Sequence, residues 1–318
     1  MANAINLIKV DVPPHCHFNV YVQEPSSNWE GKTVFLTVHD VGSTPQSFIE
    51  FVNSSPMTSV KAHSVFLHVC VPGQEDGAPT LSGDFPVPAV ILFAVLLKFR
   101  CHWPNRVLGL VLIHCLATSH GIIESVKELL LNLRLEDGHM NSAAWDYLFL
   151  HKFGLHEKAL KDAFAAELSS VINTHNLSRY LYTYSRRSNI CELIGEKLAK
   201  TDVLLVTGSR APHNENVRHM FENMRRDKST LLVVDEIMDV LIEAPNKMAR
   251  SLILFCKGLG ELSGVETPGI GRLRSASMSM EEADRPTRKF SSPSKDTIAE
   301  AKDAVKIATV LLKKSTAI

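Results

Sequence analysis

Several acidic side chains in this sequence follow a strand-like run, where residues that bind ligands often lie in α/β proteins. A cluster of four carboxylates comes directly after residues 230–234, and such a cluster could bind a divalent metal ion. Its members are Asp235, Glu236, Asp239 and Glu243. Charged side chains of a loop more often face water. We therefore predict a solvated loop here, and no metal or cofactor site.

Two adjacent pairs have the residue types of acid–base chemistry. His39 and Asp40 end the run 33–38 and could form part of an oxyanion-binding loop. Glu75 and Asp76 could act as paired carboxylates. Both pairs are surrounded by turn-forming residues, and adjacent residues of a turn usually point apart. We interpret both pairs as ordinary turns.

The remaining histidines and arginines suggest no further site. The 14 histidines show no His-x-x-x-His spacing, which a helix would need to present two metal ligands on one face. Arg179, Arg186 and Arg187 could form a basic patch, although a solvated helix face is the more ordinary interpretation.

Strand-like and helix-like patterns alternate along the chain. Short apolar and β-branched runs predict strands at 5–12, 17–23, 33–38, 65–71, 107–114, 203–208 and 230–234. Helical periodicity marks 43–51, 122–135, 143–152, 157–173, 177–199 with a break near 185–188, 215–224 and 247–259.

This order of elements is the layout of an α/β-hydrolase with a helical cap. We predict a mostly parallel sheet in a core made of residues 1–118 and 201–262. A helical cap spans 119–200. Residues 263–318 are predicted to be a mostly disordered tail rich in Ser and Arg, in which 296–314 could form a short helix.

The interval between the strands 65–71 and 107–114 is about one strand–helix unit too short for this layout. In the usual layout this interval holds two helices, a central strand and the sharp turn that carries the nucleophile. Here it has only 35 residues, 72–106. The apolar run 89–97 either stays helical and leaves a gap in the sheet or takes the place of the lost strand. We favour the helix.

The residues that a serine hydrolase of this fold needs are also missing. Its nucleophile lies in a Gly-x-Ser-x-Gly turn, and the sequence contains none. The strand 203–208 is followed by no carboxylate before Glu215, and the loop 235–245 after the last strand contains no histidine. We therefore predict no catalytic residues and expect a pseudoenzyme.

Several runs of the chain resemble the N-myc downstream-regulated (NDRG) family. They are His39 to Gly42, Val71 to Pro79, Pro104 to Ile113, Trp145 to Tyr147, Ala211 to His213 and the Arg/Ser tail. Against the family pattern, the break falls near Phe85 to Pro88. The resemblance implies an α/β-hydrolase fold without a catalytic triad and a cytoplasmic role in signalling, stress response, growth and differentiation.

The tail contains sites that fit protein kinases. Ser275 and Ser277 have arginines at positions −3, and Ser291 has Arg288 at the same spacing, a pattern that basophilic Ser/Thr kinases bind through acidic pockets. Ser292 precedes a proline and suits a proline-directed kinase. Each phosphate would add about −1.5 to −2 charges. We predict phosphorylation at all four serines.

Composition and charge exclude several other classes. Residues 271–318 contain ten Lys and Arg against six Asp and Glu, a net charge of +4, and the other 270 residues carry 24 against 28. Neither part is basic enough for nucleic-acid binding. No apolar run reaches the roughly 20 residues of a membrane span, no signal peptide is expected, and the six scattered cysteines suit a reducing compartment.

The sequence therefore predicts a cytoplasmic, non-catalytic signalling or adaptor protein that binds protein partners. The alternative is a hydrolase or lyase with a non-standard site under the cap. A buried Ser or Cys within hydrogen-bond reach of a His, in an open pocket, would favour the alternative.

Overall fold

A computed structural model describes most of the core and much of the cap. The described residues are 5–12, 16–23, 29–83, 85, 106–117, 139–154, 158–185 and 189–267. The predicted segment 89–97, the predicted helix 122–135 and the tail beyond residue 267, with all four candidate phosphorylation sites, lie outside them.

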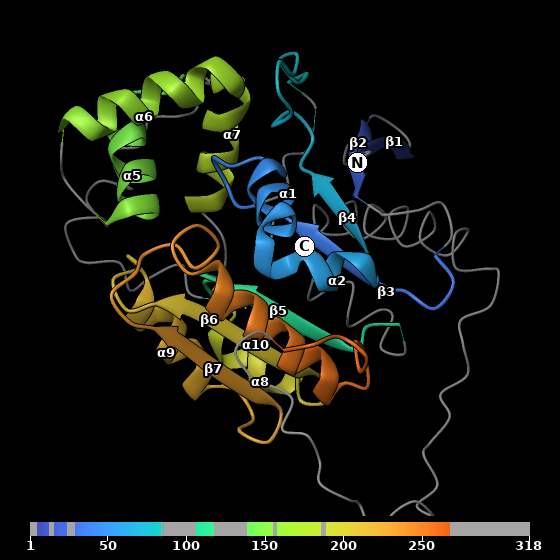
Figure 1. Cartoon of the computed structure of the whole chain (residues 1–318). Helices are drawn as coiled ribbons and strands as arrows, with labels where there is room; N and C mark the ends of the chain where they lie inside the picture. Colours follow the sequence, from blue (N-terminus) through green and yellow to red (C-terminus); the bar gives the residue numbers. More distant parts are fainter. Residues whose placement is uncertain are drawn as a thin grey trace, which may run out of the picture.

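The N-terminal sheet has four strands in the order β1-β2-β4-β3 (Figure 1). They are β1 (Ile5–Val12), β2 (Cys16–Gln23), β3 (Thr33–Val38) and β4 (Ser64–Cys70). β1 and β2 pair antiparallel, as do β2 and β4, whereas β3 runs parallel to β4. All of β4 is buried, and its residues other than Ser64 and His68 are apolar, as is typical of a strand covered on both faces.

The C-terminal sheet has three parallel strands in the order β5-β6-β7. They are β5 (Gly109–Ile113), β6 (Asp202–Gly208) and β7 (Ser229–Val234). β6 lies between its neighbours and is almost fully buried. All strands of both sheets were predicted, and most of their bounds are within two residues of the observed ones.

The two sheets are not joined by a backbone ladder in the part of the chain that the structure describes. β3 is the last strand of one sheet and β5 the first of the other. Val34 on β3 keeps 39% of its surface exposed, and Leu108 beside β5 keeps 55%. These two edges occur where the sequence predicted a lost central strand, which agrees with the shortened α/β-hydrolase layout.

Helices cover both sheets and connect them through side chains. Three N-terminal elements, α1 (Gln46–Asn53), η1 (Ser55–Met57) and α2 (Thr58–Ala62), share an apolar cluster with β6, β7 and α10 (Pro245–Gly258). Phe66 of β4 joins the same cluster. On the other face of the C-terminal sheet, α8 (Cys191–Lys197) and α9 (Asn214–Glu222) pack against β5 and β6.

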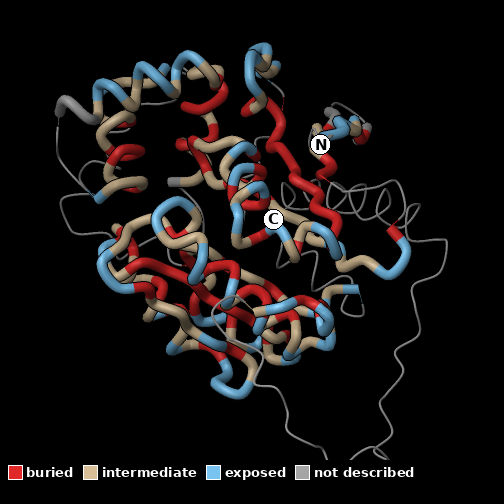
Figure 2. The backbone as a smooth tube through the Cα atoms, in the orientation of Figure 1, coloured by how far each residue is buried: buried red, intermediate tan, exposed pale blue. Residues whose placement is uncertain are grey.

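The described part of the cap consists of α5 (Ser142–Phe153), α6 (Lys158–Val171) and α7 (Thr174–Ser185). Figure 1 places these three helices together, above the C-terminal sheet. Phe149, Phe153 and Phe164 stack between α5 and α6, with ring centroids 4.9 to 6.0 Å apart. The buried sides of α5 and α7 belong to the same core cluster as β2 and β4. Figure 2 shows the buried stretches of these helices and of β4 in red.

Two helical details differ from the sequence-based expectation. The break predicted within 177–199 does separate two helices, α7 and α8, but α8 packs with the C-terminal sheet although it was assigned to the cap. The short helices η1 and α2 were not predicted, because Ser and Pro dominate their start and hide the periodicity.

Candidate functional site

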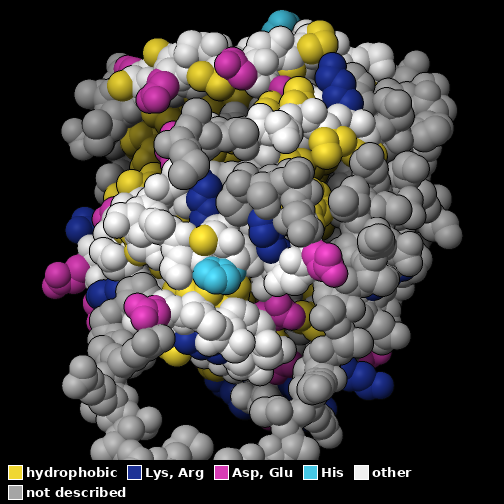
Figure 3. Space-filling view, turned by 45° about the vertical axis from the view of Figure 1, so that its right-hand side comes forward, with side chains coloured by type: hydrophobic (Ala, Val, Ile, Leu, Met, Phe, Trp, Pro, Cys, Tyr) yellow, Lys and Arg dark blue, Asp and Glu magenta, His cyan; other side chains and the backbone are white. Residues whose placement is uncertain are grey.

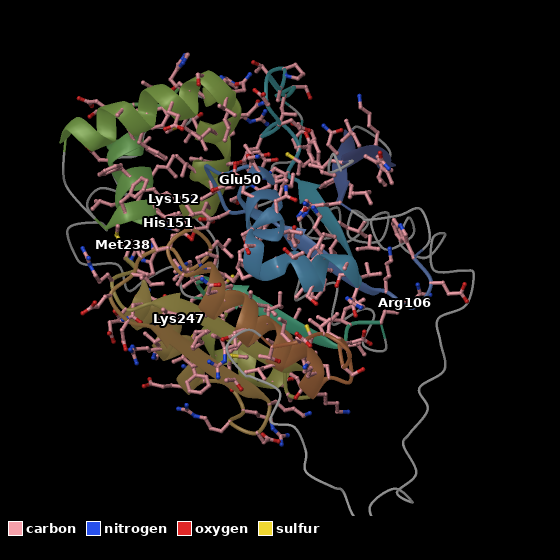
Figure 4. All side chains as sticks on the ribbon, viewed as in Figure 1. Glu50, Arg106, His151, Lys152, Met238 and Lys247 are labelled. Carbon is pink, nitrogen blue, oxygen red and sulfur yellow. The ribbon has the colours of Figure 1, made fainter. Side chains whose placement is uncertain are left out.

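Polar side chains of the core and the cap meet at the C-terminal end of α5. Loops that follow β3 and β6 supply Asp40, Ser43 and His213, and the last turn of α5 supplies His151 and Lys152. We call these five residues the seam. Figure 4 shows His151 and Lys152 at the end of α5 that faces the C-terminal half. In α/β folds this edge of the sheet is the working face.

Asp40 is the centre of the seam. Its Oδ2 accepts hydrogen bonds from Lys152 Nζ (2.8 Å) and His151 Nε2 (3.1 Å). Its Oδ1 accepts one from the backbone N–H of Val41 (2.8 Å). Burial alone would raise the pKa of this carboxyl, but Lys152 and His151 outweigh it and hold the pKa well below its usual range. The carboxylate is thus ionised and ties the cap to the core.

A second hydrogen bond extends the seam to the loop after β6. His213 Nε2 lies 3.0 Å from His151 Nδ1, and the two ring centroids are 4.9 Å apart. Both histidines are 9% exposed. Tyr147 stacks on His151 at 6.1 Å, and Tyr184 of α7 meets the same ring edge-on at 5.4 Å. His151 therefore links Asp40 to His213 inside an aromatic enclosure.

The sequence of α5 explains why His151 faces the core. Asn141 caps the helix by accepting a hydrogen bond from the N–H of Ala144, and Gly154 ends it in a left-handed conformation. Between them, Ala144, Tyr147, Leu148 and His151 form a buried stripe at helical spacing. His151 is the last member of an otherwise mostly apolar face.

Two glycines let α5 approach the core closely. A Cβ on Gly42, in the loop after β3, would lie 2.9 Å from Leu148 Cδ1. A Cβ on Gly154 would lie 3.2 Å from Pro212 Cγ. Both glycines have φ near +60°, a conformation that other residues adopt with strain. The C-terminal half of α5 is consequently packed on both loops that carry seam residues.

His39 has a structural role, as the turn interpretation predicted. The N–H of Val71 donates to His39 Nε2 (3.0 Å), so the ring proton is on Nδ1, which lies 3.0 Å from the carbonyl oxygen of Asp40. Burial lowers the pKa of His39 to about 4. The neutral ring joins the ends of β3 and β4. Asp40, in contrast, is more than a turn residue because it binds the cap.

The acidic loop after β7 binds its own backbone. Asp239 Oδ1 accepts from the N–H groups of Leu241 and Ile242, and Glu243 Oε1 accepts from those of Met238 and Asp239. Among the described residues, no group of three or more His, Cys, Asp or Glu is arranged to hold a metal ion. Two of the four carboxylates thus stabilise the loop itself.

Glu75 also accepts a hydrogen bond within its own turn, from the N–H of Gly73 (2.6 Å). The whole loop after β4 is fixed by one side of α7. Asn176 bonds to Gly73, Pro79 and Leu81, and Tyr180 donates to the carbonyl oxygen of Pro72 (2.7 Å).

Arg179 completes this attachment. It donates four hydrogen bonds of 2.8 to 3.2 Å to the carbonyl oxygens of Leu81, Ser82, Gly83 and Phe85. The proposed basic patch therefore loses Arg179 to a structural role, and Arg186 and Arg187 lie outside the described residues. On the face displayed in Figure 3, charges of both signs are interspersed.

The positions of the expected catalytic triad hold other residues. β6 ends at Gly208 and β7 at Val234. The loop that should carry the acid therefore begins at residue 209, and the loop that should carry the base begins at residue 235, as predicted. The first contains His213 and no acid before Glu215, and the second contains Asp239 and no histidine. A serine hydrolase has its acid in the first of these loops and its histidine in the second, the reverse of what is found here.

Sequence reasoning did not single out His151, Lys152 or His213. A histidine on the apolar stripe of α5 was the only local indication of His151. His213 lies within one of the runs that resemble the NDRG family. Nothing in the sequence shows that His151 contacts His213, which is 62 residues away, or Asp40, which is 111 residues away.

The two-part sheet, its covering helices and the cap define an α/β-hydrolase-like protein. Similar solved structures include the N-acyl homoserine lactonase AidH (TM-score 0.55, 13% identity, 81% of this chain and 98% of the other). Another is MenH from S. aureus (0.55, 11%, 77% and 99%). At these identities the likeness concerns the fold alone.

The chain belongs to the Ndr family, whose model matches residues 12–94 and 91–263. The two matches overlap at residues 91–94, a few residues beyond the predicted break. A C. elegans relative, uncharacterized protein ZK1073.1, is 46% identical over 85% of this chain and 90% of its own length. Protein NDRG4-B of Xenopus laevis is 22% identical over 87% and 84%, and mouse NDRG2 is 23% identical over 78% and 73%.

No helix in the described part of the chain is long and apolar enough to cross a membrane.

Proposed function

We propose that this protein is a non-catalytic signalling or adaptor protein that binds protein partners in the cytoplasm. Its role would lie in stress response, growth or differentiation, and phosphorylation of its tail would regulate it. Family membership supports this proposal in its broad form. The seam supports it independently.

The observation that carries the proposal is the pairing within the seam. The carboxylate oxygens of Asp40 accept hydrogen bonds from Lys152, His151 and the N–H of Val41. The other ring nitrogen of His151, Nδ1, is hydrogen-bonded to His213. A substrate at this edge of the sheet would have to displace these bonds. Side chains that satisfy one another across a partly buried junction favour a structural role over catalysis.

Ser43 is the one seam residue that an enzymatic alternative could use. Its Oγ lies 2.9 Å from Lys152 Nζ, which resembles a nucleophile–base pair. However, Lys152 also binds the Asp40 carboxylate and donates its proton to Ser43. A general base must accept the hydroxyl proton instead, so this geometry does not activate Ser43.

Two cysteines of the core, Cys115 beside the seam and Cys256 on α10, offer no better nucleophile. Burial, reinforced by Asp40, raises the pKa of the Cys115 thiol to about 12. Burial also raises the pKa of Cys256 to about 12. Since the thiolate is the reactive form, these thiols are inert near neutral pH.

Labelling with a fluorophosphonate probe tests the non-catalytic proposal. We expect no labelling of the full chain, and none of a Ser43→Ala variant, under conditions that label an active esterase completely. Labelling of the wild type that disappears in Ser43→Ala would establish the alternative. A panel of p-nitrophenyl esters and lactones, assayed with the same two proteins, extends the test to reactions without a stable acyl-enzyme.

The regulatory part of the proposal is tested at the four tail serines. We expect mass spectrometry to find phosphate on Ser275, Ser277, Ser291 and Ser292 after stimulation of cells that express the chain. Basophilic kinases should modify the first three, and replacement of Arg272, Arg274 and Arg288 by Ala should abolish that modification. Ser292 should be unaffected, because its recognition depends on Pro293.

A further inference from the structure

His151 and His213 form a hydrogen-bonded pair whose proton content is limited by geometry. His151 Nε2 faces Asp40 Oδ2, so it carries a proton and donates it. When His151 is neutral, its Nδ1 is an acceptor, and His213 Nε2–H must donate to it across 3.0 Å. The pair then contains one ring proton on each histidine and no net charge.

One added proton leaves this arrangement intact. The added proton binds His213 Nδ1 while the proton on His213 Nε2 moves to His151 Nδ1, so His151 becomes the imidazolium and its new N–H donates to His213 Nε2. The bond to Asp40 becomes charge-assisted and stronger. The pair is therefore bonded both with no added proton and with one.

A second added proton is incompatible with the bond. Both rings would be imidazolium ions, and an imidazolium has two donors and no acceptor. Two N–H groups and two positive charges would face each other at 3.0 Å in a site where both residues are only 9% exposed. Repulsion in such a poorly solvated site is stronger than in water.

The helix ends determine which ring takes the first proton. His151 lies in the last turn of α5, where the helix dipole favours a cation. His213 is the N-cap residue of α9, where the dipole disfavours one. Asp40 further favours the charge on His151, while Lys152 opposes it.

The other groups near the pair do not reverse this order. Tyr147 and Tyr184 present neutral rings to His151. His114, after β5, also interacts electrostatically with His151, and it hydrogen-bonds to Thr207 at 3.3 Å. Asp239 offsets a positive charge on His114.

We propose that the His151–His213 pair is a proton-sensitive latch between the cap and the core. With at most one added proton it holds the end of α5 on the loop after β6, and with two it releases that end. The released contact includes Gly154 against Pro212, so α5 would loosen from its C-terminal end first.

The test compares His213→Gln with wild type. A glutamine amide can donate to neutral His151 or, after reorientation, accept from its charged form, so the variant keeps a bond at every pH without titrating at position 213. His219→Gln is the matched control, because His219 is on α9, 60% exposed and paired only with Glu222 at 3.6 Å.

Hydrogen exchange of the α5 amides, corrected for intrinsic rates, provides the readout between pH 7.5 and 5. In wild type and His219→Gln we expect opening of residues 148–153 to increase by up to about tenfold for each pH unit below the second protonation step, because opening takes up one proton. In His213→Gln the increase should be at most about twofold. Equal pH dependence in all three proteins would overturn the proposal.

NMR of histidine ring nitrogens in the wild-type chain gives an answer even if a variant does not fold. At neutral pH both rings should carry their proton on Nε2. During acidification the pair should take up its second added proton together with the loss of α5 protection. Double protonation without that loss would equally contradict the latch.

Discussion

Leu148 of the cap packs directly on Gly42 of the core, where no side chain could fit without moving the leucine. A Cβ at position 42 would lie 2.9 Å from Cδ1 and 3.0 Å from Cδ2 of Leu148. Gly42 also has a φ of +63°. This contact, the Asp40 ion pair and the contact of Gly154 with Pro212 fix three points of α5 on the core.

Replacement of Gly42 by Ala should therefore cost more than strain alone. The positive φ costs roughly 1–2 kcal/mol for a residue with a Cβ, and overpacking against Leu148 adds about 1–3 kcal/mol. Gly77→Ala is the matched control, because Gly77 has a φ of +64° and no atom within 4 Å of the added Cβ. In denaturant unfolding, the free energy of unfolding of Gly42→Ala should be well below that of Gly77→Ala. Equal losses would mean that the cap does not press on this loop.

Asp40→Asn should weaken the cap–core junction without disrupting the loop. The amide oxygen can still accept from Val41, but the charge that binds Lys152 and His151 is lost. Since the Asp40 side chain is 39% exposed, the loss should be about 1–2 kcal/mol, below that of a fully buried pair. Asp227→Asn, in an exposed pair with Arg225, should leave unfolding unchanged. Similar effects of both variants would show that solvent screens the Asp40 pair fully.

Acid should destabilise the protein through its buried neutral histidines. Burial lowers the pKa of both His39 and His68 to about 4, whereas an unfolded histidine has a pKa of about 6.5. The unfolded chain therefore binds more protons between these values, and stability falls as the pH drops from about 6.5 to about 4. At 1.36 kcal/mol per pKa unit, each ring accounts for a loss of about 3 kcal/mol in the free energy of unfolding across this pH range.

Unfolding free energies measured at half-unit pH steps should show this slope, and His39→Gln should reduce it, although the variant is less stable at pH 7. His63→Gln, which changes an exposed ring that is bonded to Ser59, should keep the wild-type slope. A wild-type stability that is flat from pH 6.5 to 4.5 would contradict the buried neutral state.

Arg179→Lys should behave almost like Arg179→Ala, because one ammonium group cannot reach the four carbonyl oxygens that the guanidinium binds. We expect both variants to make residues 72–83 sensitive to limited proteolysis. Arg218→Ala, at a half-buried position on α9 remote in sequence from this loop, should remain resistant. Resistance of Arg179→Lys would mean that positive charge, rather than forked geometry, holds the loop.

The strands of this chain were predictable because their sequences carry a local pattern. β4 is buried on both faces and reads as a mostly apolar run interrupted by His68, and β3 was located to the residue. The interval between the strands 65–71 and 107–114 was likewise visible in the sequence as too short for the layout. The break between β3 and β5 agrees with that expectation.

The seam was not predictable from local pattern. Asp40 looked like a turn residue, and its partners His151 and Lys152 are more than 100 residues away on a cap helix. Only the packing of α5 through Leu148 and Gly154 brings them together. Arg179 was misread for the same reason, since an arginine that binds loop carbonyl oxygens and a solvated arginine have the same sequence.

The unjoined edges of β3 and β5 also have a consequence for cooperativity. In a continuous sheet, backbone hydrogen bonds make neighbouring strands unfold together. Here the described link between the halves is made by side chains, including the apolar cluster around Phe66 and the 2.6 Å bond from Thr33 to Glu261. The amides of β4 and β6 can therefore exchange with solvent in separate unfolding events, so that this one domain would melt as two units.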